Sequence, residues 1–231
     1  MTALRRRLAV TLAGVTVAAA ALAGCSGDDD AAPKTTAGER STRAGGTLTT
    51  LSLGPVLTWD PQRIATRDDM AFAVRIFART LTAYAPGTSA DEQSRLVGDL
   101  ATDTGTPNDD FTQWRFTLRE GAKWQDGTPV TCADLAYGIS RTFATTVISG
   151  GSTDALAVLD VPRGLDGSST YRGPYDTSKA NAAGQQAFSK AVSCTGSTIT
   201  FRLSAPTADF NEMLTLPAFS PIKRAKDKGK D

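Results

Sequence analysis

The hydrophobic and polar positions of this chain change period several times, and each change predicts an element. Trp114, Phe116 and Leu118 alternate with polar residues, which predicts a strand with one buried face. Residues 198–203 alternate in the same way and predict a second strand. Residues 46–53 are rich in threonine and leucine and stop at Gly-Pro, so we expect the first strand of the chain there.

Apolar positions three and four residues apart predict the helices. Thr66 and Asp69 have the spacing of a capping box, and a helical apolar stripe follows over residues 70–81, which we interpret as a core face. Thr131 precedes a second helix, whose inward face begins with Cys132. Weaker patterns predict helices over residues 179–192 and 209–216.

The connecting stretches carry turn residues. Asp126-Gly127 predicts a tight turn, and Pro61 requires an extended or turning Asp60. Residues 149–178 are rich in Gly, Ser, Asp and Pro, which predicts an irregular surface excursion. Residues 223–231 are charged and featureless.

The N-terminal pattern is of another kind. Three arginines at residues 5–7 precede an apolar run from Leu8 to Leu22, which is short for a membrane helix and ends in small residues, as an export signal does. Leu-Ala-Gly-Cys at residues 22–25 resembles the lipobox of bacterial lipoproteins, in which the cysteine is acylated and becomes the new N-terminus. The alternative is a non-lipidated secretory signal with an incidental Cys25. Export by the general or the twin-arginine route stays open.

The segment after Cys25 has no apolar periodicity. Residues 26–44 cannot bury enough apolar surface to offset their ordering entropy, so we expect a flexible tether with a reach of about 25 Å. The expected organisation is a lipoprotein signal over residues 1–24, a tether over 25–44 and one globular region over 45–231.

Charge and composition limit the partners. Removal of the three leader arginines leaves 22 basic against 24 acidic residues, and this balance argues against nucleic acid as a partner. Two cysteines remain after Cys25, namely Cys132 and Cys194, in a chain without histidine. Two thiolates alone make a poor zinc site, so an exported chain favours a disulfide between them.

One long stretch carries a family resemblance. Residues 114–138, WRFTLREGAKWQDGTPVTCADLAYG, resemble the signature of extracytoplasmic solute-binding proteins of the oligopeptide and dipeptide class, which serve ABC importers. Residues 57–61 and 198–221 support this resemblance. It implies an α/β, two-lobed periplasmic-binding-protein-like fold with an extra N-terminal subdomain. By this analogy residues 46–53 open lobe I, residues 60–206 build the extra subdomain, and the chain is truncated before the second lobe.

The resemblance also implies the function. We expect a membrane-tethered receptor, anchored by lipid to the outer face of the cell membrane, that captures peptides or similar solutes and delivers them to ABC permease subunits. The expectation includes no enzyme activity and no cofactor. The alternative is a truncated remnant of such a receptor that binds nothing.

Candidate ligand contacts follow the first predicted strand. Residues at the carboxyl end of a strand commonly line the ligand crevice of α/β folds, so Thr58, Trp59 and Asp60 are candidates for the cleft wall. Asp60 has the charge to pair with the ammonium group of a peptide. The competing interpretation is simple turn packing.

Catalytic and metal motifs find little support. The absence of histidine excludes Ser-His-Asp and Cys-His arrangements. Ser220 and Lys223 fit a Ser-x-x-Lys pattern, but the Ser-Asp-Asn and Lys-Thr-Gly partners of serine acyl-enzymes are missing. Asp166, Ser168 and Thr170 lack the glycine and glutamate of a calcium loop, so we expect no metal site.

Overall fold

The computed structural model describes residues 45–47, 49–52 and 54–229. The chain divides into two units, residues 1–51 and 52–231, and every described helix and strand lies in the second unit. The leader, Cys25 and the whole of the predicted tether, residues 1–44, fall outside the described residues. Within the described ranges, no helix combines the length and the apolar character that crossing a membrane requires.

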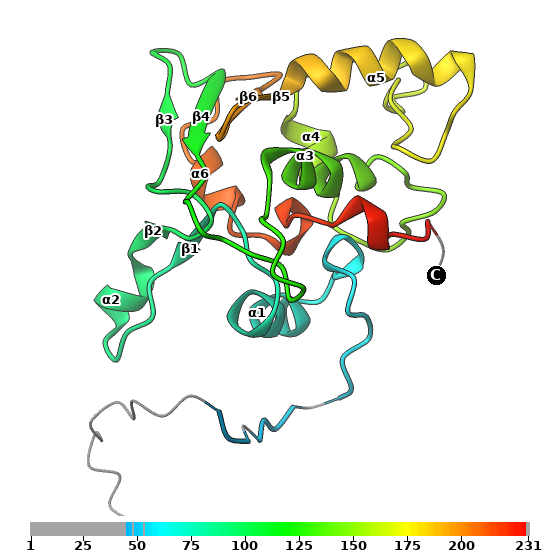
Figure 1. Ribbon diagram of the computed structural model, residues 1–231. Coiled ribbons are helices and arrows are strands. Elements are labelled where there is room, and N and C mark those ends of the chain that lie inside the picture. Colours follow the sequence, from blue (N-terminus) through cyan, green and yellow to red (C-terminus); the bar gives the residue numbers. More distant parts are fainter. Residues whose placement is uncertain (1–44, 48, 53, 230–231) are drawn as a thin grey trace, which may run out of the picture. The chain divides into compact units, whose positions relative to one another are not determined.

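The central feature is a four-stranded antiparallel sheet with the strand order β3-β4-β6-β5 (Figure 1). Its two middle strands are the two predicted from alternation. Trp114 pairs with Phe201 and Phe116 with Ile199, so the apolar residues of both strands share one buried face. The strands are β3 (Thr106–Pro107), β4 (Gln113–Thr117), β5 (Val192–Thr195) and β6 (Thr198–Arg202).

Four strands were not predicted from the sequence, and the edge strand β3 is one of them. Strand β5 follows the preceding helix without a loop and reaches β6 through a turn that contains Gly196. A separate two-stranded sheet pairs β1 (Thr82–Tyr84) with β2 (Leu96–Gly98). Each of these four strands has only two to four residues, too few to establish an alternation.

The predicted caps form as expected. The Thr66 hydroxyl accepts a hydrogen bond from the Asp69 N–H at 3.2 Å, and Thr131 and Asp134 form a complete capping box. The longer helices are α1 (Arg67–Ile76), α3 (Cys132–Arg141) and α5 (Lys179–Ala191), and the shorter ones are α2 (Ala90–Ser94), α4 (Asp154–Val158), α6 (Phe210–Met213) and the 3₁₀ turns η1 (Pro61–Arg63), η2 (Pro217–Phe219) and η3 (Arg224–Lys226).

The predicted first strand is wrong within the described part of residues 46–53. Residues 46, 47 and 49–52 carry no strand, and the Leu51 side chain is 98% exposed. A β-strand depends on a neighbouring strand for its hydrogen bonds, and no neighbour pairs with these residues. Residues 48 and 53 lie outside the described residues.

Two other predictions need correction. Helix α1 ends at Ile76, so the predicted stripe over residues 70–81 is not one helical core face, although Leu81 beyond the helix is buried. The excursion over residues 149–178 is mostly irregular, but it contains α4, and Leu159 and Tyr171 anchor it in the core. Isolated apolar anchors of this kind have no period, so the sequence pattern did not identify them.

Helix α3 lies against the segment that follows the sheet. A Cβ atom on Gly138 would lie 2.1 Å from the Ser220 carbonyl oxygen, so only glycine permits this approach of backbone to backbone. The Ile222 N–H donates to the Asp134 carbonyl oxygen of the same helix at 3.1 Å. These two contacts hold the segment around Ser220 and Ile222 against α3.

A disulfide joins α3 to the sheet. Cys132 on α3 and Cys194 on β5 form the bond, with their Cα atoms 5.9 Å apart and 62 residues apart along the chain. In the chain-entropy model, a disulfide that closes a loop of this length stabilises the folded state by about 4 kcal/mol, because it restricts the unfolded chain. The strand held by the disulfide is β5, which precedes the strand predicted over residues 198–203.

Replacing both cysteines, Cys132→Ala with Cys194→Ala, is expected to lower the free energy of unfolding by about 2 to 4 kcal/mol, because the unfolded chain regains its loop entropy. Urea unfolding followed by circular dichroism measures the change. A reductant should lower the midpoint of the parent chain and leave that of the double variant unaltered. Equal midpoints for the parent and the variant would contradict the stabilising role.

Candidate ligand-binding groove

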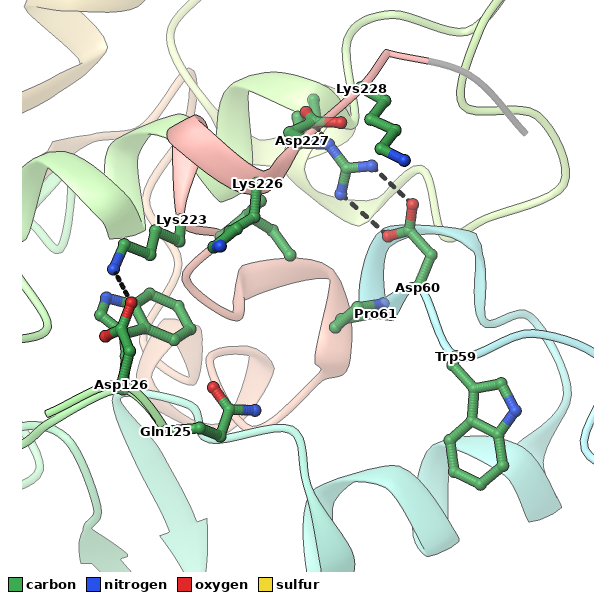
Figure 2. A pocket seen from close by; sticks show the side chains of 12 residues that line it. Trp59, Asp60, Pro61, Gln125, Asp126, Lys223, Lys226, Asp227 and Lys228 are labelled. Carbon is green, nitrogen blue, oxygen red and sulfur yellow. Dashed lines mark hydrogen bonds and ion pairs between the residues drawn. The ribbon is translucent and has the colours of Figure 1, made fainter. Parts of the chain in front are cut away.

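A groove of about 620 Å³ lies beside the carboxyl end of α3, and we call it the Arg141 groove (Figure 2). Its walls come from the residues before η1, from the turn that contains Asp126-Gly127 and from the C-terminal segment. The lining residues are Trp59, Asp60, Pro61, Trp124, Gln125, Asp126, Arg141, Ile222, Lys223, Lys226, Asp227 and Lys228.

Local sequence places Asp60 at the edge of this groove. Pro61 follows it, and the Asp60 backbone is extended, with φ −84° and ψ 113°, as predicted. The Asp60 side chain caps η1 by accepting a hydrogen bond from the Gln62 N–H at 3.1 Å. The carboxylate is thereby held close to α3.

Arg141 is the buried centre of the site, with a side chain only 5% exposed. Its Nη1 and Nη2 atoms donate to the two carboxylate oxygens of Asp60 at 2.8 and 2.5 Å, as the dashed lines in Figure 2 mark. Its Nε atom donates to the Tyr175 hydroxyl at 2.8 Å and lies 2.9 Å from Asp227 Oδ2. One guanidinium therefore joins two carboxylates that are 167 residues apart along the chain.

Asp227 is as deeply buried as Arg141, with a side chain 6% exposed. The hydroxyls of Tyr137 and Tyr175 donate to its Oδ2 atom at 2.8 and 2.5 Å. Burial alone raises the pKa of Asp227, but the hydrogen bonds from Tyr175, from the Gly229 N–H and from Tyr137 outweigh it, and the pKa is lowered. Asp227 is therefore a carboxylate at neutral pH.

The pKa values of the groups that contact Asp227 are raised. Burial, and then the hydrogen bonds to Asp227, raise the pKa of Tyr137 and of Tyr175, so both phenols stay protonated and donate. Burial lowers the pKa of Arg141, but the hydrogen bonds to Asp60 and Tyr175 outweigh it and raise the pKa. The network is therefore fully charged and internally satisfied.

Gln62 extends this network to η2. Its side chain is buried, its Nε2 atom donates to the Ser220 carbonyl oxygen at 3.0 Å, and its Oε1 atom accepts from Arg141. These bonds tie η1 to the segment that crosses α3 at Gly138. The floor of the Arg141 groove is consequently held by hydrogen bonds from several directions.

The opposite wall is a turn closed by an ion pair. Gly127 has φ +80°, and Lys223 binds the Asp126 carboxylate and the Thr128 hydroxyl, as Figure 2 shows for Lys223 and Asp126. The hydrogen bond from Lys223 is the largest cause that lowers the pKa of Asp126. The predicted Asp-Gly turn is confirmed.

Aromatic side chains supply the apolar surface of the groove. Trp59 is 62% exposed, and its ring packs against Phe77 and Phe72 at centroid distances of 5.3 and 6.0 Å. Figure 2 shows Trp59 at one margin of the groove and Asp126 at the other. Trp124 also lines the groove, and its Nε1 donates to Asp134 at 3.4 Å. An exposed indole on a fixed aromatic base is suited to stacking against a ligand.

The charges that remain available are positive. The three carboxylates of the lining, Asp60, Asp126 and Asp227, are all engaged with Arg141 or Lys223. Lys226 and Lys228 are exposed, and no carboxylate in the described part of the chain pairs with either. The groove therefore offers aromatic faces and two available ammonium groups.

The structure places the three predicted ligand contacts differently from one another. Trp59 and Asp60 line the groove, whereas Thr58 does not, and its hydroxyl accepts from the Asp60 N–H at 3.1 Å. The Asp60 carboxylate pairs with Arg141, with Arg63 at 3.5 Å, and its side chain is 22% exposed.

Sequence reasoning missed Arg141, Asp227 and the two lysines. Arg141 and Asp227 act through partners distant in sequence, so no local pattern marks them. The lysines lie in a segment that looked featureless. The sequence held one signal for these lysines: several lysines follow Ser220-Pro221 closely.

Ser220 and Lys223 do not form the hydrogen-bonded pair that a serine acyl-enzyme would need. Ser220 is buried, its hydroxyl has no hydrogen-bond partner among the described residues, and Lys223 is bound to Asp126 and Thr128 instead. Asp166 accepts hydrogen bonds from the N–H and hydroxyl of Ser168, which is a local turn. Across the described ranges, no three metal-ligating side chains cluster.

The pKa shifts predict how stability depends on pH. The folded pKa of Asp227 lies below its ordinary value of 3.8, so its contribution is present above about pH 4 and is lost as the pH falls through the lowered value. The pKa values of Tyr137 and Tyr175 lie above 10.0, so their contribution is present below pH 10 and is lost as the pH rises further. Asp227→Asn should cost about 3 kcal/mol at pH 7 and flatten the acid limb.

Urea unfolding at a series of pH values checks this dependence. Asp91→Asn, which removes an exposed carboxylate on α2, is the matched control and should reproduce the parent curve. An acid limb that is equally steep in Asp227→Asn and in the parent would refute the assignment.

Comparison with known proteins agrees with this architecture. The fold resembles a clavulanic acid biosynthesis oligopeptide binding protein, with a TM-score of 0.60 and 30% identity over 73% of this chain and 28% of that one. It also resembles the murein tripeptide binding protein MppA of Escherichia coli, with a TM-score of 0.52 and 22% identity, a likeness of fold alone. The predicted α/β periplasmic-binding-protein-like fold is confirmed, and the chain spans less than a third of either structure.

Sequence relatives point to the same class. The chain is 59% identical over 34 residues to the periplasmic oligopeptide-binding protein OppA of Salmonella typhimurium, covering 15% of this chain and 6% of that protein. It is 36% identical over 78 residues to MppA of Escherichia coli, covering 30% and 14%. These relatives are binding proteins, so the prediction of a non-enzymatic class is confirmed. Residues 95–231 match the model of bacterial extracellular solute-binding proteins, family 5, middle region, and the chain belongs to this family.

Proposed function

We propose that this chain captures peptides or peptide-like solutes outside the cytoplasm for an ABC importer, with the Arg141 groove as part of its solute-facing wall. The observation that carries the proposal is the family match over residues 95–231, which includes most of the residues that build the groove. The names of the relatives, oligopeptide-binding and murein peptide-binding, favour peptides as the solute class.

The groove suits part of a peptide. The indole of Trp59 can stack on an apolar side chain, and the ammonium groups of Lys226 and Lys228 can attract a carboxylate. Asp60 acts here by orienting Arg141, and Thr58 by holding the Asp60 backbone. Of the three predicted contacts, we assign direct solute contact to Trp59.

The proposal includes tethering and delivery. A leader over residues 1–24 is removed, Cys25 carries the lipid, residues 25–44 form the tether, and residues 45–231 belong to the solute-binding region. The bound solute passes to permease subunits, and separate subunits supply the energy of ATP hydrolysis. No energy-coupling motif occurs in the printed sequence, which is consistent with this division of labour.

Incubation of the chain with a peptide digest, followed by mass spectrometry of the retained peptides, is expected to identify short bound peptides. Isothermal titration with a synthetic copy of one of them should then give saturable binding. Trp59→Ala should weaken this binding about tenfold, because a stacking aromatic side chain is lost. Leu165→Ala, which removes an exposed apolar side chain outside the groove, is the matched control. Retention of no peptide, or equal affinity for Trp59→Ala and the parent, would contradict the proposal.

Metabolic labelling with palmitate in a bacterial host is expected to mark the parent chain and to leave Cys25→Ser unmarked, because the acyl groups attach at this residue. The paired variant Cys132→Ala with Cys194→Ala should still be labelled, which separates the lipid from the disulfide cysteines. Label that persists in Cys25→Ser, or that is absent from the parent, would count against the anchor.

A further inference from the structure

A second cavity, of about 650 Å³, lies between α3 and α5, and we call it the α3–α5 cavity. It shares no lining residue with the Arg141 groove. Figure 1 shows α3 and α5 as neighbouring helices beside the sheet. The residues that matter for its chemistry are Tyr137, Ser140, Tyr171, Phe188, Ser189 and Arg224.

The cavity has an uncompensated positive charge. Arg224 is the one charged residue in its lining, and no carboxylate lines it within the described part of the chain. The Arg224 guanidinium lies over the Tyr137 ring, 5.5 Å from the ring centroid, and forms no ion pair with any described residue. A guanidinium with this contact alone keeps its hydrogen-bond donors available.

A buried hydroxyl points to a missing partner. Tyr171 is 1% exposed, and its hydroxyl has no hydrogen-bond partner among the described residues. Native structures rarely leave a buried polar atom unpaired, so an orphan of this kind requires an explanation. The neighbouring Ser140 hydroxyl donates to the Tyr137 carbonyl oxygen at 2.6 Å.

Tyr171 lines the α3–α5 cavity together with Ser140 and Arg224. Burial raises the pKa of Tyr171 to about 12, while the Ser140 hydroxyl and the positive charge of Arg224 lower it. Both of these groups line the α3–α5 cavity. The phenol ring itself is fixed by stacking on Phe188 at a centroid distance of 4.8 Å.

We propose that the α3–α5 cavity binds a small aromatic carboxylate, with its carboxylate between Arg224 and the Tyr171 hydroxyl and its ring against the aromatic wall. The planar guanidinium fork matches a carboxylate, and the phenol supplies a further donor. The rings of Tyr137 and Phe188 supply the apolar wall. The volume lies in the usual range for small-molecule sites. This is a second binding site, separate from the solute groove.

Isothermal titration of the full chain with phenylacetate tests the site. We expect saturable binding at one site per chain. Benzyl alcohol, which has the ring without the charge, and inorganic phosphate, which has the charge without the ring, should each bind at least about tenfold more weakly. No binding of phenylacetate, or equal binding of either comparison compound, would overturn the proposal.

Three variants locate the binding. Arg224→Gln should weaken phenylacetate binding about tenfold or more, because the charge-assisted hydrogen bonds are lost. Lys226→Gln removes a nearby cation that lines the other groove, and it should leave the affinity unchanged. Tyr171→Phe should weaken binding and also raise the thermal midpoint of the unliganded chain, because it removes a buried unpaired hydroxyl. A merely structural role for Tyr171 would not produce both effects.

The test is independent of the proposed function. Arg224→Gln should retain its peptides, and an excess of bound peptide should not displace phenylacetate. Displacement by peptide would place phenylacetate in the Arg141 groove and overturn the proposal, as would Arg224→Gln with the affinity of the parent.

Discussion

The fold around the candidate site depends on one buried cation, Arg141, which is held between the carboxylates of Asp60 and Asp227. Removing a guanidinium and two carboxylates from water is costly, and their mutual attraction offsets the cost only when the remaining polar atoms are satisfied. Here Gln62 and Tyr175 satisfy the guanidinium, and two phenols satisfy Asp227. Loss of one member would leave an unpaired buried charge, so the network specifies a single arrangement of η1, α3 and the C-terminal segment.

This arrangement decides what the groove can recognise. The acidic groups of the lining are consumed internally, by Arg141 on one side and by Lys223 on the other. Lys226, Lys228 and the exposed Trp59 are left to face a ligand. The available chemistry therefore favours solutes with a carboxylate and an apolar group, and a free peptide has both. The sequence predicts that Asp60 can bind an ammonium group, and in the structure its carboxylate pairs with Arg141.

The sequence predictions succeed where the interaction joins residues close together in the chain, and they fail where it joins residues far apart. Strands β4 and β6 and the caps at Thr66 and Thr131 were predictable because alternation and capping are local in sequence. The strand predicted over residues 46–53 was wrong in its described part because β propensity carries no information about a partner strand. The pairing of Arg141 with Asp227 could not be predicted, since only the packing of α3 at Gly138 brings the C-terminal segment to it.

Tyr137 contributes to both the Arg141 network and the α3–α5 cavity. Its hydroxyl donates to Asp227 in the Arg141 network, while its ring lies beneath Arg224 in the α3–α5 cavity. The position of the ring is fixed by its hydroxyl and by α3, so it does not depend on the contact with Arg224. Arg224 is exposed and has no ion pair within the described residues, so it can turn toward an anion at little cost. A ligand can then fill the α3–α5 cavity while the ion pairs beneath the solute groove stay intact.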